Sequence, residues 1–255
     1  MSVDSLRDRW DNIPELVNIK LHLATLNNEF ISKFEPERSN LANSLYRGLS
    51  RPIWKHDKYP FNIVQNYWNP IELIENISRV EYCGNQYYDF RGIDLGRPAN
   101  FYGARLDKID FSFSTGRTSR LISLSYCSEC LFNNVDYHSG NFSYAFVNCR
   151  FIKAKLFANY WSASVIKGCL FESCKLTKCH LSLSDISDCN FINCDFRQAS
   201  LARSRLTNIM FQSCSFRQGL FDEDASLYKN CQFIDCDFRN TAMGILPPQE
   251  MIKQS

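Results

Sequence analysis

The sequence predicts a mainly β, repetitive fold that follows an N-terminal α-helical segment. Every fifth residue from Phe146 to Phe221 is large and apolar, and the residue two positions earlier is mostly small. Residues 1–85 lack this rhythm and show apolar positions at helical spacing. A period of five fits neither the 3.6-residue period of a helix nor the two-residue period of a plain strand, so the chain is expected to be built of stacked repeats.

The repeat is most regular in the second half of the chain. Its large positions are Phe146, Phe151, Leu156, Trp161, Ile166, Phe171, Leu176, Leu181, Ile186, Phe191, Phe196, Leu201, Leu206, Phe211, Phe216 and Phe221. The small positions are Cys149, Ala154, Ser164, Cys169, Cys174, Cys179, Ser184, Cys189, Cys194, Ala199, Ser204, Cys214 and Gly219, with Tyr144, Asn159 and Ile209 as exceptions. Weaker units extend through Phe101, Leu106, Phe111, Ile122, Phe132, Tyr137 and Phe142 on one side, and Phe233, Phe238 and Met243 on the other.

Units such as CDFRQ, ASLAR and CNFIN resemble those of the pentapeptide-repeat family, which read Ala/Cys, Asp/Asn, Leu/Phe and two polar residues. The resemblance implies a right-handed four-sided β-helix, a solenoid in which four units form one coil of about twenty residues. Residues 86–244 are therefore expected to form the β-helix in seven or eight coils. Residues 1–85 are expected to be a helical N-terminal cap or a partner-binding arm, and residues 245–255 a C-terminal tail.

The N-terminal region contains three expected helical segments. Apolar residues at Leu16, Ile19, Leu23, Leu26, Phe30 and Phe34 follow Pro14 at the spacing of one helix face. A short helix is expected from Asn40 to Leu49, and a third begins where Asn69 caps Pro70 and the sequence IELIENISRV follows. The sequence SRPIWKHDKYPF is expected to be a loop, and the residues before Pro14 a looser arm.

The twelve cysteines fit core packing better than metal binding. Ten of them lie two positions before a large residue, and two series, Cys149–Cys169–Cys189 and Cys174–Cys194–Cys214, repeat at the twenty-residue coil period. They are expected to form reduced ladders inside the rod. The only C-x-x-C pair, Cys127 and Cys130, has no second pair or nearby histidine, so no metal site and no cofactor are expected.

Two interruptions of the repeat are expected to form surface structure of unknown role. Between Phe111 and Ile122 eleven residues replace ten, which predicts an exposed bulge near Phe113–Arg120. A second interruption spans FDEDASLYKNC, near Asp222–Asn230. Its acidic run lacks the full pattern of a calcium loop and therefore predicts no cation site.

Nothing in the sequence predicts an enzyme, because it contains no nucleophile elbow, zinc-protease motif or phosphate-binding glycine loop. His180 is expected to point outward beside Tyr160, one coil earlier. No stretch is long and apolar enough to span a membrane, and the charged start MSVDSLRDRWDN is unlike a secretory signal, so a cytoplasmic location is expected.

The predicted function is a non-enzymatic scaffold for protein–protein interaction, acting through the flat faces of the rod and the N-terminal segment. The alternative is a protein that binds DNA gyrase or topoisomerase, as the quinolone-resistance branch of the family does by mimicking DNA. Residues 86–245 carry 18 Lys and Arg against 15 Asp and Glu, a net charge of +3, whereas DNA mimicry needs a strongly negative surface. Direct nucleic-acid binding is a third and weaker hypothesis, because this net charge is small.

Two sets of outward residues are candidate partner-binding surfaces. Lys155, Lys175, Lys178, Arg197 and Arg217 fall at coil spacing and predict a basic stripe relieved only by Asp195, which suits an acidic partner or is merely a solvated face. On the adjacent face, Ile152, Leu170, Ile192 and Met210 predict an apolar column, which is either scattered surface or an interface. Its candidate occupants are a partner, a second copy of the rod in a homodimer, or the chain's own helix around Leu23 to Phe34.

Overall fold

The computed structural model describes residues 2–46, 69–74, 76–95, 101, 103–117, 122, 125–142, 144–242 and 245–254. The helices are α1 (Val3–Asn12), α2 (Pro14–Tyr46) and α3 (Pro70–Leu73), with 3-10 turns η2 (Ala225–Leu227) and η4 (Gln249–Met251). The strands in the first half are β1 (Arg79–Tyr82), β2 (Asn85–Asp89), β3 (Arg105–Asp107), β4 (Ile109–Asp110), β5 (Thr115–Gly116), β6 (Ser125–Ser128), β7 (Asp136–Tyr137), β8 (Tyr144–Val147) and β9 (Arg150–Ile152). They are followed by β10 (Val165–Lys167), β11 (Leu170–Glu172), β12 (Asp185–Ser187), β13 (Asn190–Ile192), β14 (Arg205–Thr207), β15 (Met210–Gln212), β16 (Tyr228–Lys229), β17 (Gln232–Ile234) and β18 (Ile252–Lys253).

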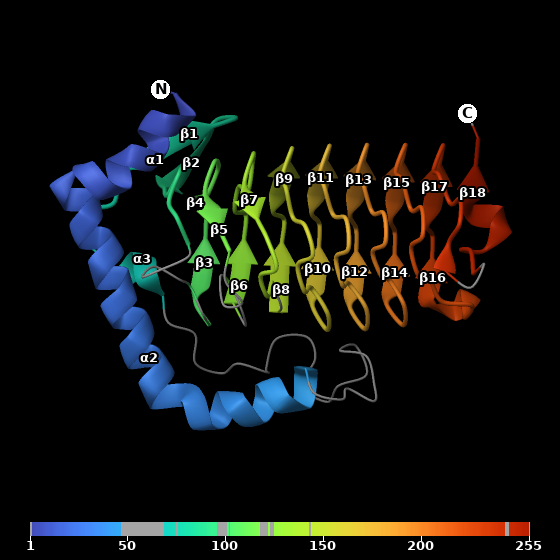
Figure 1. Cartoon of the computed structure of the whole chain (residues 1–255), viewed down its shortest axis with the longest axis horizontal. Helices are drawn as coiled ribbons and strands as arrows, with labels where there is room; N and C mark the ends of the chain where they lie inside the picture. Colours follow the sequence, from blue (N-terminus) through green and yellow to red (C-terminus); the bar gives the residue numbers. More distant parts are fainter. Residues whose placement is uncertain are drawn as a thin grey trace.

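The strands stack into a four-sided β-solenoid of about eight turns, which confirms the predicted fold class (Figure 1). Face A is the parallel sheet β3-β6-β8-β10-β12-β14-β16, and face B is the parallel sheet β9-β11-β13-β15-β17-β18. Face C begins with the short parallel pair β5–β7, and from there faces C and D are ladders of single bridges. On face C these join Asp136, Lys155, Lys175, Asp195, Ser215 and Asp237, and on face D they join Asn141, Tyr160, His180, Ser200 and Leu220.

The register of the coils is twenty residues in the middle of the rod, where Phe151, Phe171, Phe191 and Phe211 are successive partners. It departs from twenty at both ends. Cys127 pairs with Leu106 twenty-one residues earlier, Lys155 with Asp136 nineteen earlier, and Phe233 with Phe211 twenty-two earlier. The solenoid thus tolerates a residue more or less at a corner while its backbone pairing continues.

All sixteen large repeat positions are buried inside the rod. Phenylalanine rings on face B stack from coil to coil: the centroids of Phe151 and Phe171 are 4.5 Å apart, those of Phe171 and Phe191 4.7 Å and those of Phe191 and Phe211 4.9 Å. These separations match the spacing of hydrogen-bonded strands, so one period sets both the backbone ladder and the side-chain stack. Met243 lies outside the described residues.

The corners between faces depend on a backbone conformation that the sequence analysis did not predict. The residue two positions after each large residue from Phe146 to Phe216 has a positive φ, including Lys178 (60°), Leu183 (65°), Asn193 (53°) and Asn208 (55°). This left-handed conformation suits Asn and Gly and costs energy for Leu. The corners therefore contain a small amount of strain that is repeated along the rod.

The N-terminal cap is more ordered than expected before Pro14. Residues 3–12 form α1, not a loose arm, and Leu6 and Trp10 are buried against the first coil. The Trp10 ring stacks on Phe90 with centroids 5.6 Å apart. Gly92 has a φ of 76°, and a Cβ there would lie 2.4 Å from the Leu6 carbonyl oxygen, so glycine lets α1 approach this closely.

The predicted helix after Pro14 is present as α2, which buries Ile19, Leu23 and Asn27 (Figure 1). Leu23 has no exposed surface and belongs to the core cluster at the cap, so α2 up to Asn27 does not dock on the apolar column of face B. The side chains of Phe30 and Phe34 lie outside what the structure describes.

Other expectations for the N-terminal region need correction. The short helix from Asn40 is a continuation of α2 up to Tyr46, and the predicted loop SRPIWKHDKYPF lies outside the described residues. Asn69 caps α3 by accepting a hydrogen bond from the Ile71 amide at 3.1 Å, as predicted, but α3 ends at Leu73. The sequence after it enters the antiparallel β1–β2 hairpin, and β2 then pairs in parallel with β4.

The predicted bulge after Phe111 was also wrong in part. Residues 112–116 belong to the coil, with Ser112 and Ser114 buried and Thr115 and Gly116 in β5. Residues 118–121 lie outside the described part of the chain. The second interruption contains η2, which begins where the Asp224 carboxylate accepts a hydrogen bond from the Ser226 amide at 2.9 Å.

The expected C-terminal tail is not loose either. Strand β18 pairs in parallel with β17, with Phe233 beside Ile252 and Ile234 beside Lys253. This pairing adds a short strand to face B at the end of the rod (Figure 1).

Candidate functional site

The interior of the rod is filled by side chains that serve packing. Cysteine thiols donate to carbonyl oxygens of the preceding coil, as Cys194 does to Phe171 at 3.4 Å and Cys214 to Phe191 at 3.3 Å. Serines form a similar ladder, since the Ser164 amide donates to the Ser184 hydroxyl at 3.1 Å and the Ser184 amide to the Ser204 hydroxyl at 3.2 Å. The cysteines and serines thus supply hydrogen-bonding groups inside an apolar core.

The buried Cys179 thiol is poorly suited to chemistry. Burial raises the pKa of the Cys179 thiol to about 12, so the reactive thiolate is scarce at neutral pH. All twelve cysteines are free thiols; Cys83 is exposed and Cys236 half-buried. Among the described residues, no group of three or more His, Cys, Asp and Glu side chains is arranged to hold a metal ion.

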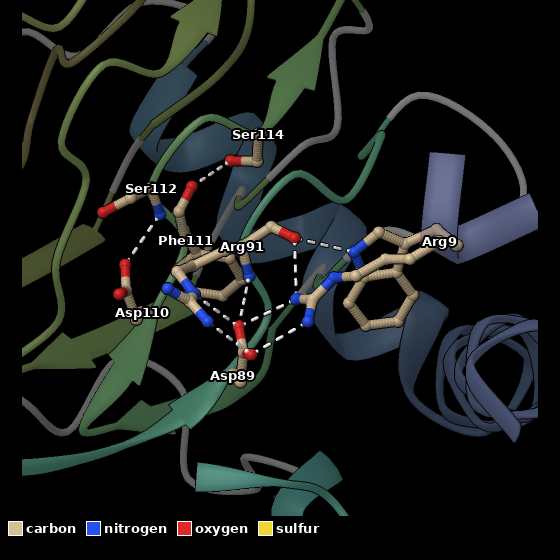
Figure 2. A network of polar contacts seen from close by, with 8 residues as sticks. Arg9, Asp89, Arg91, Asp110, Phe111, Ser112 and Ser114 are labelled. Atoms are coloured by element: carbon tan, nitrogen blue, oxygen red, sulfur yellow. Dashed lines mark hydrogen bonds and ion pairs between the residues drawn. The ribbon is translucent and has the colours of Figure 1, made fainter. Parts of the chain in front are cut away.

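A polar network joins the cap to the first coils and was not predicted from the sequence (Figure 2). The Arg9 guanidinium donates to both carboxylate oxygens of Asp89, at 2.8 and 2.9 Å, and Arg91 donates to the same carboxylate at 2.9 Å. Arg9 and the Trp10 indole also donate to the Arg91 carbonyl oxygen, at 2.9 and 2.8 Å. The network fixes α1 on the end of the rod.

Asp89 is ionised in this network, although only 7% of its side chain is exposed. Burial alone would raise the pKa of its carboxyl group. Hydrogen bonds from Arg91 and Arg9, together with their positive charges, outweigh burial and hold that pKa well below its usual range. The network therefore joins α1 to the first coil through an ionised, doubly paired carboxylate.

The five predicted basic residues all lie on face C. Lys155 and Lys175 are bridge partners on adjacent coils, Arg197 and Arg217 lie one and two coils further along, and Lys178 lies at the following corner. All five are exposed. The structure therefore brings them together on one flat face.

The expectation that Asp195 alone relieves this stripe was wrong. Asp136 and Asp237 occupy the same column, and Asp136 lies 3.5 Å from the Lys155 ammonium. Asp195 pairs with Arg197 at 2.7 Å, and Asp237 pairs with Arg239 at 2.8 Å. Face C is therefore a basic face with some of its charges compensated internally.

The four predicted apolar residues lie on face B but do not form a single column. At the first position of successive strands, the order along face B is Arg150, Leu170, Asn190 and Met210. At the last position of successive strands, Glu172 lies between Ile152 and Ile192. All four apolar side chains are half-buried, so face B presents an alternating mixture of polar and apolar side chains.

Two aromatic side chains are the most exposed large apolar residues of the rod's middle coils. Phe157 on face C is 37% exposed and Tyr160 on face D is 46% exposed. The Tyr160 ring stacks on His180 with centroids 4.8 Å apart and planes 7° apart, which confirms their predicted juxtaposition. These exposed rings add an apolar component to the corner between faces C and D.

Comparison with known proteins agrees with the architecture. A family model described as pentapeptide repeats, in eight copies, matches residues 166–201 and 179–218. The four-sided solenoid and these repeats together define a pentapeptide-repeat β-helix. The chain therefore contains pentapeptide repeats over residues 166–218.

Solved structures of QnrB1, a plasmid-mediated fluoroquinolone resistance protein, are similar to this chain. A trypsin-treated variant is 16% identical, with 64% of this chain and 86% of that chain covered and a TM-score of 0.34. A second trypsin-treated variant is 15% identical over 62% and 78% of the two chains, with a TM-score of 0.30. Full-length QnrB1 is 10% identical over 64% and 91%, with a TM-score of 0.22. No protein of curated function matches the sequence.

Among the helices in the described part of the chain, none combines the length and apolar character needed to cross a membrane.

Proposed function

We propose that the protein is a non-enzymatic scaffold that binds a protein partner through the outer faces of its rod, with face C as the main contact. The observation that carries the proposal is the basic surface of face C, where Lys155, Lys175, Lys178, Arg197 and Arg217 project from consecutive coils of a rigid solenoid. Because successive coils are hydrogen-bonded, the cations are held at fixed separations before a partner arrives.

The other surfaces have smaller parts in this proposal. The buried faces of α1 and of α2 up to Asn27 are used to cover the first coil, so they are unavailable as a docking arm. Face B contributes half-buried apolar side chains beside the basic face. DNA mimicry toward gyrase remains the alternative function, but a net charge of +3 over residues 86–245 does not favour it.

Site-specific photo-crosslinking in cells tests the proposal. A photoreactive amino acid at Gln198 would report on face C, and the same amino acid at Lys167 would report on face A, since both positions are exposed. A protein adduct is expected from position 198 and not from position 167, and it should disappear in the variant K175E/R217E. Equal adducts from both positions, or none from position 198, would contradict the proposal.

A matched control separates local charge from total charge. The variant K167E/K229E makes the same change in net charge at two exposed lysines of face A, and should keep the adduct.

A DNA-gyrase supercoiling assay tests the alternative function, DNA mimicry. Inhibition of gyrase by the protein, or its rescue from a quinolone, would favour DNA mimicry instead.

A further inference from the structure

Face C contains cations that its own carboxylates do not pair. Arg197 and Arg239 form ion pairs with Asp195 and Asp237. Within the described residues, no ion pair involves Lys175, Lys178 or Arg217. The cations without an ion pair therefore lie at two levels: the coil of Lys175 and Lys178, and the coil of Arg217 two steps further along.

An exposed aromatic ring lies one coil before the first of these levels. Phe157 lies between the His138 ring, with centroids 5.9 Å apart, and the Lys178 ammonium, which is 5.5 Å from the ring centroid. Aromatic residues and arginine are enriched at protein interfaces. Phe157, Lys175, Lys178 and Arg217 thus lie along one side of the rod, with the coil of Asp195 and Arg197 before the level of Arg217.

The spacing of this strip matches an α-helix. Adjacent coils are about 4.8 Å apart, so the level of Phe157 is about 5 Å from that of Lys175 and about 14 Å from that of Arg217. One turn of an α-helix rises 5.4 Å and three turns rise about 16 Å. Long acidic and basic side chains absorb a mismatch of about 2 Å.

The ion pairs of face C argue against a continuous polyanion. A nucleic-acid duplex carries a phosphate every few ångströms along its length, so it would also face the level where the Asp195–Arg197 pair leaves no net positive charge. A helix can place a neutral side chain at that level and acidic side chains at the levels of Lys175 and Arg217. Charge complementarity therefore favours a discrete acidic helix over DNA or RNA.

We propose that face C binds an acidic α-helix of a partner protein lying along the rod axis, with an apolar side chain over Phe157. One turn later an acidic residue would meet Lys175 and Lys178, and two turns after that a second acidic residue would meet Arg217. The intervening turn lies over the Asp195–Arg197 pair and is neutral. This inference names the partner's chemistry for the proposed function and rests on it.

The test uses a displayed library of 18-residue α-helical peptides in which five positions on one face are randomised. Selection on the full-length protein is expected to enrich an apolar residue, an acidic residue four positions later and another acidic residue seven positions after that. The enrichment should vanish on K175E/R217E and persist on K167E/K229E. Circular dichroism and melting temperature of each variant establish that the rod is folded.

A charge-reversal experiment then tests the proposed contact between Arg217 and the second acidic residue of the peptide. The best selected peptide should bind the R217E variant at least tenfold more weakly, and a peptide with lysine in place of its second acidic residue should recover most of that loss. Enrichment of acidic residues without this spacing, equal selection on K175E/R217E, or tighter binding of an 18-base-pair duplex would each overturn the inference. If position 198 crosslinks a partner while the library returns no such helix, the inference fails and the proposed function stands.

Discussion

Replacing Phe191 by alanine should destabilise the rod by about 4 kcal/mol, near the middle of the range for large-to-small core changes. Phe191 is 1% exposed, and its ring is stacked between Phe171 at 4.7 Å and Phe211 at 4.9 Å, with Phe196 edge-on at 5.3 Å. The truncation removes a fully buried ring and also three aromatic contacts. Hydrogen-bonded strands on both sides hold the neighbouring coils apart, so the cavity cannot close by collapse.

Urea unfolding followed by circular dichroism measures this loss as a change in the free energy of unfolding. Phe157→Ala is the matched control, because it removes the same side chain from a 37% exposed position of the same rod. The control should lose no more than about 1 kcal/mol. A loss below about 1 kcal/mol for Phe191→Ala, or equal losses for the two variants, would refute the reasoning from stacked interior rings.

Four further outcomes follow from the cap, the corners and the thiols. Leu183→Asn should raise stability by about 1 kcal/mol in urea, because Leu183 has a φ of 65° that asparagine adopts more readily; a loss would show that leucine packing outweighs the corner strain. The pKa of Asp89 is lowered in the folded state, so its stabilisation is present above its unfolded value of 3.8 and is lost as the pH falls through and below that value. Asp89→Asn should therefore lower the melting temperature at pH 7 and weaken its decline toward pH 3, and an unchanged pH profile would contradict the role of Arg9 and Asp89. A thiol reagent should label Cys83 rapidly in the native protein; rapid labelling of Cys169 or Cys189 would contradict their burial. Because burial raises the pKa of Cys179 from 9.0 to about 12, its neutral thiol contributes stability up to about pH 9, and thermal denaturation should show that contribution lost between pH 9 and 12.

The sequence was enough to predict the interior of the rod, because each coil repeats the same local pattern. Phe151, Phe171 and Phe191 lie at a fixed spacing, and the same spacing fixes their pairing. The basic residues of face C could be predicted from the same twenty-residue spacing. Its acidic members did not, because Asp136 lies nineteen residues before Lys155 and Asp237 twenty-two after Ser215, so a strict spacing of twenty overlooks both.

Contacts between the cap and the rod could not be predicted in this way. Arg9 meets Asp89 across eighty residues of sequence, and no repeat relates the two positions. The early end of α3 was missed for a similar reason, since the apolar residues after Pro70 suit a longer helix locally, whereas residues 79–82 pair with β2 in the folded chain. Tertiary hydrogen bonding decided these elements over local preference.

The affinity of a partner recovered by crosslinking at position 198 tests the central claim most directly. It should be measured by isothermal titration calorimetry with the wild-type protein, K175E/R217E and K167E/K229E at one salt concentration. Binding through face C predicts at least a tenfold weaker affinity for K175E/R217E and a change of less than threefold for K167E/K229E. Equal affinity for wild type and K175E/R217E, or equal losses in the two variants, would contradict it.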